Sequence, residues 1–359
     1  MIRNIPALTG VRGYAALWVV LMHYTWGAGI KGDGLFMHIL LYGFSGVIVF
    51  LVLSGFVMAH VYPEFRKSVN PAPYRAYFYK RIARIYPMHL VTLFAFLALM
   101  KAGYPIETPN ETAYTFGLNL LLIQAWGFVN QFSWNALSWT ISVEMFAYIW
   151  FPFTALVMFK LPRFFAAAVM AGVVWILIEM PHVRLLQSAG IDVNGIVLAH
   201  GNFLIQFSSV FVAGVALYRV VEGIDKLPAA VSDGLIIAGI AVFAYACATP
   251  FHSWIMTCGA LLLIAGLLCD KGLGRLLFGN RVSVFLGEIS YSLYLTHFLL
   301  NVVLSIEIAG LRLADKISLA ICTATISYYL IERPSRRILR KLGTRRKMVA
   351  QADVVPATT

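Results

Sequence analysis

GLIIAGIAVFAYAC, residues 234–247, contains no charged side chain. A surface helix of a soluble protein would show a polar stripe at helical spacing, and this segment has none. The stretch FFAAAVMAGVVWILIE, residues 164–179, is equally apolar up to its final Glu179. With their flanking residues, both runs reach about 20 residues, the length that crosses a hydrocarbon core of roughly 30 Å. We therefore predict an integral membrane protein.

Similar apolar runs recur along the whole chain. We predict an all-α, polytopic bundle of about ten transmembrane helices, near residues 11–29, 38–61, 85–103, 137–158, 163–181, 201–219, 231–249, 252–269, 283–306 and 313–331. The apolar segment Phe116–Phe128 is too short for a span, and counting it would invert the orientation of every later loop. We predict that it is a re-entrant or interfacial piece.

Composition and charge agree with this fold. Hydrophobic residues make up 60% of the 359 residues and charged residues 12%, about half the share usual in soluble domains. With the N-terminus in the cytoplasm, all but five of the 28 Lys and Arg residues fall in cytoplasmic segments; the five are Lys31, Lys101, Arg184, Arg312 and Lys316. The positive-inside rule thus predicts that both termini are cytoplasmic.

The net charge of +12 implies no nucleic-acid partner, because basic loops beside anionic lipid account for it. We predict one transmembrane domain over residues 1–335 and a basic cytoplasmic tail over residues 336–359. The four cysteines contain no CxxC pair and lie within or beside apolar runs, so we expect no metal site and no disulfide framework. Nothing in the sequence fixes the oligomeric state.

Ionisable side chains inside membrane spans are costly unless paired or wetted, so each is a candidate functional group. Arg12 and His23 are eleven residues apart in the first run, which places them on one helix face about 16 Å apart. Glu144 and His297 fall at a depth similar to that of His23. A His beside a carboxylate is a common proton acceptor, so we expect these three groups to converge. The alternative is a set of separate, satisfied polar contacts.

A second group of charges lies at the predicted inner surface. Arg81 and Arg84 fall in the predicted cytoplasmic loop Tyr74–Pro87, three residues apart and on one side. Two guanidinium groups there can bind phosphate bidentately, although an ordinary basic loop fits the spacing as well. Ser54-Gly55 lies near the inner end of the second run, where Gly permits close approach of a helix or a ligand.

Six ordered motifs resemble the acyltransferase family 3 membrane proteins, bacterial O-acyltransferases that modify surface and exported glycans. The motifs are Leu8–His23, which carries Arg, ten residues and His; Phe50–Phe56; Arg81-Ile82-Ala83-Arg84 with Tyr86-Pro87; Trp139–Glu144; Ile289–His297; and Ile331–Pro334. Thr9 stands where the family often has Asp, and Thr140 where it often has Ser. Neither position carries a group that we assign to the chemistry.

The resemblance implies transfer of an acyl group, with acetyl as the default, from cytoplasmic acyl-coenzyme A to a hydroxyl of a polysaccharide or glycolipid at a bacterial inner membrane. Acyl-coenzyme A is then a co-substrate, and no bound cofactor is expected. His23 would act as general base or carry the acyl group, with Glu144 or another buried acceptor orienting it or the sugar. The donor would bind at Arg12, Arg81, Arg84 and Ser54. The acceptor side would be lined by Trp139, Ser142, Tyr291, Tyr294 and His297.

A transporter is the alternative, because buried His and Glu side chains also form proton relays in carriers. Such a carrier usually shows repeated halves with matching broken helices, and the sequence shows no such pair. A purely structural membrane protein would leave the Arg12–His23 spacing and the Arg81–Arg84 pair without a purpose.

Overall fold

The computed structural model is helical throughout the residues that it describes. These are 5–27, 34–104, 108, 110–129, 131–188, 200–223, 227–249, 252–269, 271–307, 311–339 and 341, with the backbone alone for 179–188, 200–203 and 305–307. No strand occurs among them.

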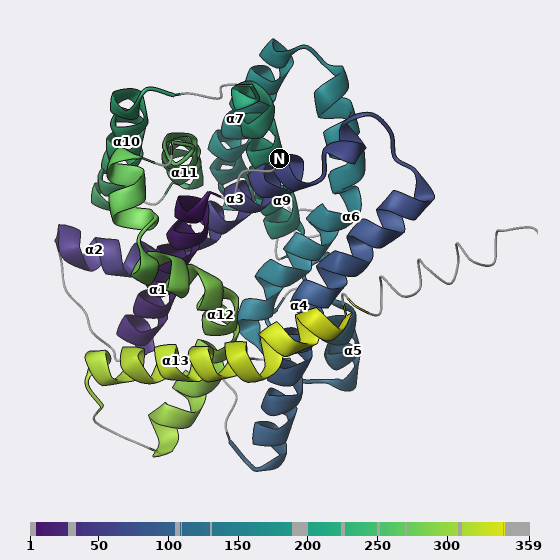
Figure 1. The fold of residues 1–359 in the computed structure, drawn as a ribbon. Coiled ribbons are helices and arrows are strands. Elements are labelled where there is room, and N and C mark those ends of the chain that lie inside the picture. Colours follow the sequence, from purple (N-terminus) through teal and green to yellow (C-terminus); the bar gives the residue numbers. More distant parts are fainter. Residues whose placement is uncertain are drawn as a thin grey trace, which may run out of the picture.

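Helices occupy all ten of the predicted positions (Figure 1). They are α1 (Pro6–Gly27), α2 (Leu35–Leu41) with the turn η1 (Tyr42–Phe44) and α3 (Ser45–Val61), α4 (Pro71–Lys101), α6 (Trp139–Lys160), α7 (Arg163–Ser188), α9 (His200–Val221), α10 (Ala229–Ala248), α11 (Ser253–Gly266), α12 (Arg281–Glu307), and α13 (Leu313–Ser327) with the π-helical turn η5 (Tyr328–Glu332). Among the described residues, short elements join them: η2 (Pro63–Arg66), the helix α5 (Ala113–Leu121), η3 (Ala136–Ser138) and the π-helical turn η4 (Gly274–Phe278).

Five helices in the described residues are long and apolar enough to cross a membrane. They are Leu35–Val61, Pro71–Lys101, Ala136–Lys160, Leu204–Val221 and Ala229–Ala248. Two shorter apolar helices, Arg163–Ile178 and Ser253–Gly266, accompany them. The chain is therefore a membrane protein, whereas ten full spans and the cytoplasmic position of both termini stay predictions.

The predicted loop Tyr74–Pro87 is wrong: these residues form the first half of α4, which runs unbroken through Pro87. Helix formation starts where Pro71 occupies the first turn, a position that needs no backbone N–H donor. Tyr77, Arg81, Ile85 and Met88 then bury one face at helical spacing. That buried face holds the segment in the helix despite its high charge.

The segment predicted to be re-entrant or interfacial forms the short helix α5 (Ala113–Leu121) followed by a turn. Thr112 caps α5, and Leu122 ends it in the left-handed conformation at φ 58°. Ser142 on α6 then accepts a hydrogen bond from the Ala125 N–H (3.1 Å) and donates one to the Leu122 carbonyl (2.9 Å). These two hydrogen bonds tie the segment, which is too short to span a membrane, to the first turn of α6.

Helices α1 and α12 are in direct backbone contact, and this contact positions the site described below. Gly287 has no room for a Cβ because the carbonyl of Thr9 lies against it, and Gly13 packs against Leu286 in the same way. Small residues allow such close approach between membrane helices. Gly55 on α3 likewise packs on the backbone of α9 at Phe211, so this glycine serves helix packing.

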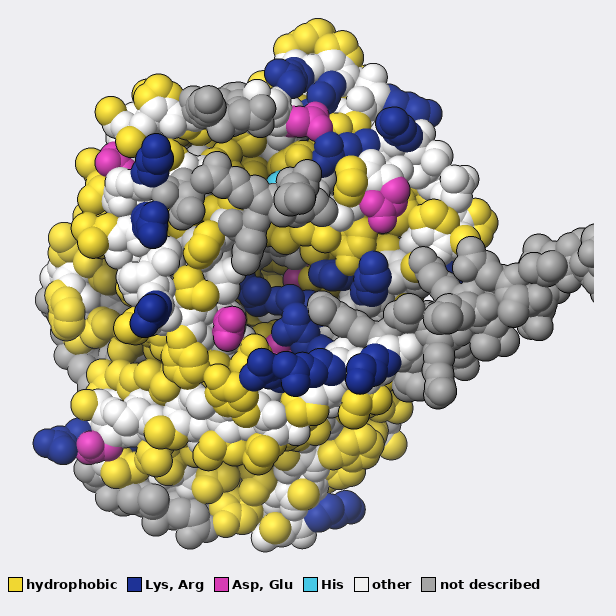
Figure 2. Space-filling view, in the orientation of Figure 1, with side chains coloured by type: hydrophobic (Ala, Val, Ile, Leu, Met, Phe, Trp, Pro, Cys, Tyr) yellow, Lys and Arg dark blue, Asp and Glu magenta, His cyan; other side chains and the backbone are white. Residues whose placement is uncertain are grey.

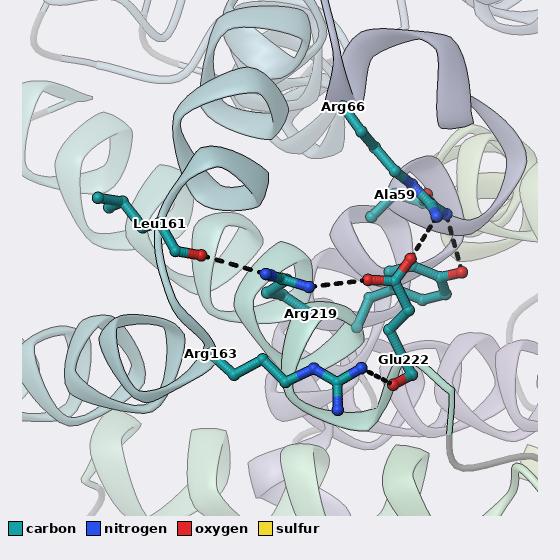
Figure 3. Close-up of polar contacts among 7 residues, drawn as sticks. Ala59, Arg66, Leu161, Arg163, Arg219 and Glu222 are labelled. Atoms are coloured by element: carbon teal, nitrogen blue, oxygen red, sulfur yellow. Dashed lines mark hydrogen bonds and ion pairs between the residues drawn. The ribbon is translucent and has the colours of Figure 1, made fainter.

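Several arginines at the predicted inner surface are committed to holding the fold together (Figure 3). Glu222, just after α9, accepts hydrogen bonds from Arg66 (2.5 Å) and Arg219 (3.0 Å). Arg163 donates to the backbone carbonyl of Glu222 over 2.7 Å, and Arg219 also donates to Leu161. These contacts join η2, α9 and the link between α6 and α7.

The helix continues from η5 to residue 339, past the predicted start of the tail at residue 336. The Tyr79 hydroxyl donates to the Leu339 carbonyl over 3.0 Å and ties this end to α4. Most of the predicted tail, residues 342–359, lies outside the described residues.

Candidate active site

A cavity of about 140 Å³ lies between α1, α3, α4, α6 and α12. This is roughly ten times the space that one water needs. Its polar lining consists of Arg12, Ser54, Arg81, Arg84, Thr140, Glu144, Tyr148, Ser290, Tyr291 and Tyr294. The cavity thus collects all four residues that were predicted to bind the donor, from three different helices.

Three arginines and one carboxylate give the cavity wall a net positive charge. Arg81 is buried, and its guanidinium donates to the Tyr62 hydroxyl over 2.8 Å and lies beside the Met58 sulfur. By contrast, Arg12 and Arg84 make no hydrogen bond or ion pair in the described part of the chain. Two guanidinium forks therefore face the cavity with free donors, which suits a phosphate or carboxylate ligand.

Glu144 is fixed in this cavity by two hydroxyls. Its Oε1 accepts a hydrogen bond from Ser54 on α3 (2.9 Å) and one from Tyr148, one turn along α6 (2.5 Å). Hydrogen bonds to a carboxylate are about twice as strong as neutral ones, so this triad joins α3 to α6. Ser54, predicted to bind the donor, lines the cavity and holds Glu144.

A pair of histidines lies farther along α1 and α12. His297 Nε2 lies 3.4 Å from His23 Nδ1, and the ring centroids are 5.2 Å apart. His297 is fully buried, whereas His23 is half-buried. The predicted meeting of His23 and His297 is therefore present in the structure.

Glu144 does not join this pair. Its hydrogen bonds are to Ser54 and Tyr148, and no contact links it to either histidine among the described residues. Tyr294 lies between the two groups: it lines the cavity, its ring centroid is 6.0 Å from that of His297, and its hydroxyl accepts from Thr140 at 3.0 Å. Depth along a helix follows from residue counting, whereas the direction that Glu144 faces depends on how α6 packs.

The predicted acceptor-side residues have different positions. Tyr291 and Tyr294 line the cavity, and the Tyr291 hydroxyl donates to the Ile85 carbonyl over 2.6 Å. Ser142 donates a hydrogen bond to the Leu122 carbonyl at the end of α5. The centroid of the Trp139 ring lies 4.9 Å from that of the Phe207 ring. Neither Ser142 nor Trp139 lines the cavity.

Two buried polar residues were not predicted, Tyr148 of the cavity wall and Glu332 outside it. Tyr148 follows Glu144 by four residues, a spacing that places both on one helix face and was available as a signal. Glu332 in η5 is buried, where it accepts from Ser292 (2.7 Å) and pairs with Arg336 (3.2 Å). An ionisable residue at the end of an apolar run marks such a position for attention.

Figure 2 shows Lys and Arg side chains gathered over α4 and the C-terminal helix, beside a hollow near the centre of the drawn face. Across the described residues, no group of three or more His, Cys, Asp or Glu side chains is arranged to hold a metal ion.

The comparisons with known proteins match this arrangement to one family. The acyltransferase domain of the acyltransferase 3 family matches residues 5–331. Acyltransferase MdmB of Streptomyces mycarofaciens is 28% identical, over 99% of this chain and 96% of its own length. A Komagataeibacter xylinus protein named "Putative membrane-bound transacylase BcsY" is 27% identical, over 91% of this chain and 81% of its own length.

A protein of Staphylococcus aureus (strain COL) named "Putative O-acetyltransferase" is 24% identical, over 93% of this chain and 58% of its own length. No solved structure matches the chain. The family match extends from the start of α1 to η5, so it includes the arginine cavity and the histidine pair. The chain is a membrane acyltransferase and belongs to the acyltransferase 3 family.

Proposed function

We propose that this acyltransferase takes its acyl group from acyl-coenzyme A, bound at the arginine cavity, and transfers it to a hydroxyl of a glycan. The observation that carries the proposal is a pair of guanidinium groups, Arg12 and Arg84, that face the cavity without a partner among the described residues. α1 is unbroken from Pro6 to Gly27, so Arg12 and His23 lie on one helix about 16 Å apart.

The charge of the cavity favours a polyanionic donor. Coenzyme A carries a diphosphate and a further phosphate, and a guanidinium binds phosphate through two parallel hydrogen bonds. Arg81 would add positive charge from a fixed position, because Tyr62 and Met58 already hold it. The long pantetheine arm would then carry the thioester from the cavity towards His23.

His23 would supply the proton transfer. Its Nε2 takes the proton of the acceptor hydroxyl while that oxygen attacks the thioester carbonyl. The new C–O bond forms, the C–S bond breaks, and the leaving thiolate takes the proton from Nε2. The products are the ester and free coenzyme A, and His23 returns to its neutral form. Glu144 would keep Ser54 and Tyr148 in place in the wall of the donor cavity.

The acceptor side of the proposal rests on the names of relatives and on the family. An O-acetyltransferase forms an ester on a hydroxyl, so an acetyl group and a polysaccharide or glycolipid hydroxyl are the first choices. A bacterial inner membrane would bring the cytoplasmic donor and an exported glycan to one protein. A transporter, the alternative function, is disfavoured because the chain belongs to an acyltransferase family.

The test uses the purified full chain in detergent with acetyl-coenzyme A and a thiol reagent. We expect steady release of free thiol, and a transporter would release none. The Arg84→Ala variant should need more donor for half-maximal release, while Arg163→Ala, which alters an arginine of the Glu222 cluster, should not. No thiol release from well-folded protein with acetyl-, succinyl- or longer-chain acyl-coenzyme A would overturn the proposed donor.

A further inference from the structure

We propose that His297 is a positioning residue that, together with the Val19 carbonyl, holds the His23 ring in place with its Nε2 free to accept a proton. This inference rests on the proposed role of His23 and goes beyond it by assigning its orienting partner. Glu144 was expected to fill that place, yet the structure puts an imidazole there.

The protonation of His297 follows from its neighbours. Its Nδ1 lies 3.0 Å from the carbonyl oxygen of Leu293. A carbonyl oxygen only accepts hydrogen bonds, so Nδ1 must carry the hydrogen. In a neutral imidazole the other nitrogen then has a lone pair. Nε2 of His297 is therefore an acceptor, and it faces Nδ1 of His23.

The same reasoning fixes His23. Its Nδ1 lies 2.9 Å from the Val19 carbonyl oxygen, so this nitrogen carries the hydrogen. That hydrogen is shared between the Val19 oxygen and His297 Nε2, both of which only accept in this arrangement. The lone pair of His23 is left on Nε2. No polar atom of the described residues bonds to this Nε2. This nitrogen is also not one of the buried side-chain atoms that lack a hydrogen-bond partner.

The arrangement also suits the charged form of His23. When Nε2 takes a proton, the ring becomes a cation and its Nδ1–H becomes a stronger donor. The acceptors for that stronger bond are already in place on Val19 and His297. A carboxylate orients the base in many hydrolases, and a neutral imidazole fills that position in this site.

His297 is itself held rigidly enough for this role. Its side chain is fully buried, its Nδ1 is anchored to Leu293, and its own backbone carbonyl accepts from the Tyr24 hydroxyl at 3.1 Å. Tyr24 follows His23 directly on α1, so a second bond between α1 and α12 lies beside the first.

The test compares two amides at this position, because each replaces one half of the imidazole. His297→Gln places an amide oxygen near the position of Nε2 and keeps an acceptor for His23. His297→Asn keeps a group near Nδ1 for Leu293 but cannot reach His23. Loss of a general base costs about 10²–10⁴-fold in rate, so we expect His297→Asn to lose about tenfold or more in kcat. His297→Gln should stay within about threefold, and KM for acetyl-coenzyme A should stay unchanged in both.

His89→Gln is the matched control, since His89 is also fully buried and also bonded to a carbonyl, that of Asn119 at 2.8 Å, outside the cavity. Equal kcat for the Asn and Gln variants, or a change in KM alone, would overturn the positioning role. The proposed function fails separately: if His23→Ala keeps its rate, His23 is not the base. If His23→Ala is inactive while His297→Asn and His297→Gln have equal kcat, only the role of His297 is refuted.

Nitrogen-15 spectra of histidine-labelled protein give an independent readout. The His23 signals are identified by their loss in His23→Ala. We expect them to show a protonated Nδ1 and an unprotonated Nε2 in the unaltered protein and in His297→Gln. His297→Asn should show a shifted Nδ1 signal, because the Nδ1 hydrogen then bonds to the Val19 carbonyl alone, and an unchanged spectrum there would contradict the inference.

Discussion

The Tyr148 hydroxyl, one turn farther along α6 than Glu144, donates a hydrogen bond to the Glu144 carboxylate over 2.5 Å. Ser54 completes the arrangement from α3, so this carboxylate of the cavity wall is held from two sides.

Replacing Glu144 by Gln should therefore reduce transfer without abolishing it. The amide oxygen still accepts from Ser54, whereas the negative charge in the cavity that the three arginines line is lost. We expect a smaller fall in kcat than for His23→Ala, measured as thiol release under saturating donor. A Glu144→Gln protein as inactive as His23→Ala, with unchanged expression, would place the carboxylate in the chemical step.

Arg84 and Arg81 should respond differently to alanine. Arg84 has no partner in the described residues, so Arg84→Ala should raise KM for the donor about ten- to hundredfold, the equivalent of one charge-assisted phosphate contact, with little loss of stability. Arg81→Ala should also lower the thermal midpoint, because it leaves the buried Tyr62 hydroxyl without its partner. Equal thermal midpoints for the two variants would contradict this division of roles.

His23→Ala should abolish transfer while insertion into the membrane persists. Removing an imidazole deletes a costly polar group from the membrane interior, so folding should not suffer. The expected loss is about 10²–10⁴-fold in the rate of glycan acylation. A variant that keeps more than about a tenth of the normal rate would make His23 a packing residue and move the search to His297 or Glu144.

The predicted orientation is open to a labelling test. Lys67 and Ala113 are both exposed in the structure and lie on opposite sides in the predicted topology. An impermeant thiol reagent applied to intact cells should label Ala113→Cys and leave Lys67→Cys unlabelled until the membrane is opened. The parent with its four native cysteines replaced supplies the background. Labelling of Lys67→Cys in intact cells would invert the topology.

The sequence predicted the helices well because their length and apolar character follow from the bilayer. It failed at Tyr74–Pro87, where charge and proline are typical of a loop. The buried face of Tyr77, Arg81 and Ile85 overrides that local signal, and this packing is tertiary information.

The site was predictable within single helices and less so between them. The Arg12–His23 spacing on α1 follows directly from helical geometry. The direction of Glu144 does not, because it depends on the rotation of α6 against α3. Arg81 and Arg84 look alike in sequence. The structure distinguishes them, because Arg81 donates to Tyr62 whereas Arg84 has no partner among the described residues.

The contact between α1 and α12 limits how this enzyme can move. Because Gly13 and Gly287 leave no space between the two backbones, α1 and α12 pack as a close pair that carries both histidines. In the reaction proposed above, the catalytic cycle admits acyl-coenzyme A from one side and releases an esterified product. We therefore expect any gate along this route to belong to the surrounding helices, so that His23, the proposed proton acceptor, keeps its position while its substrates are exchanged.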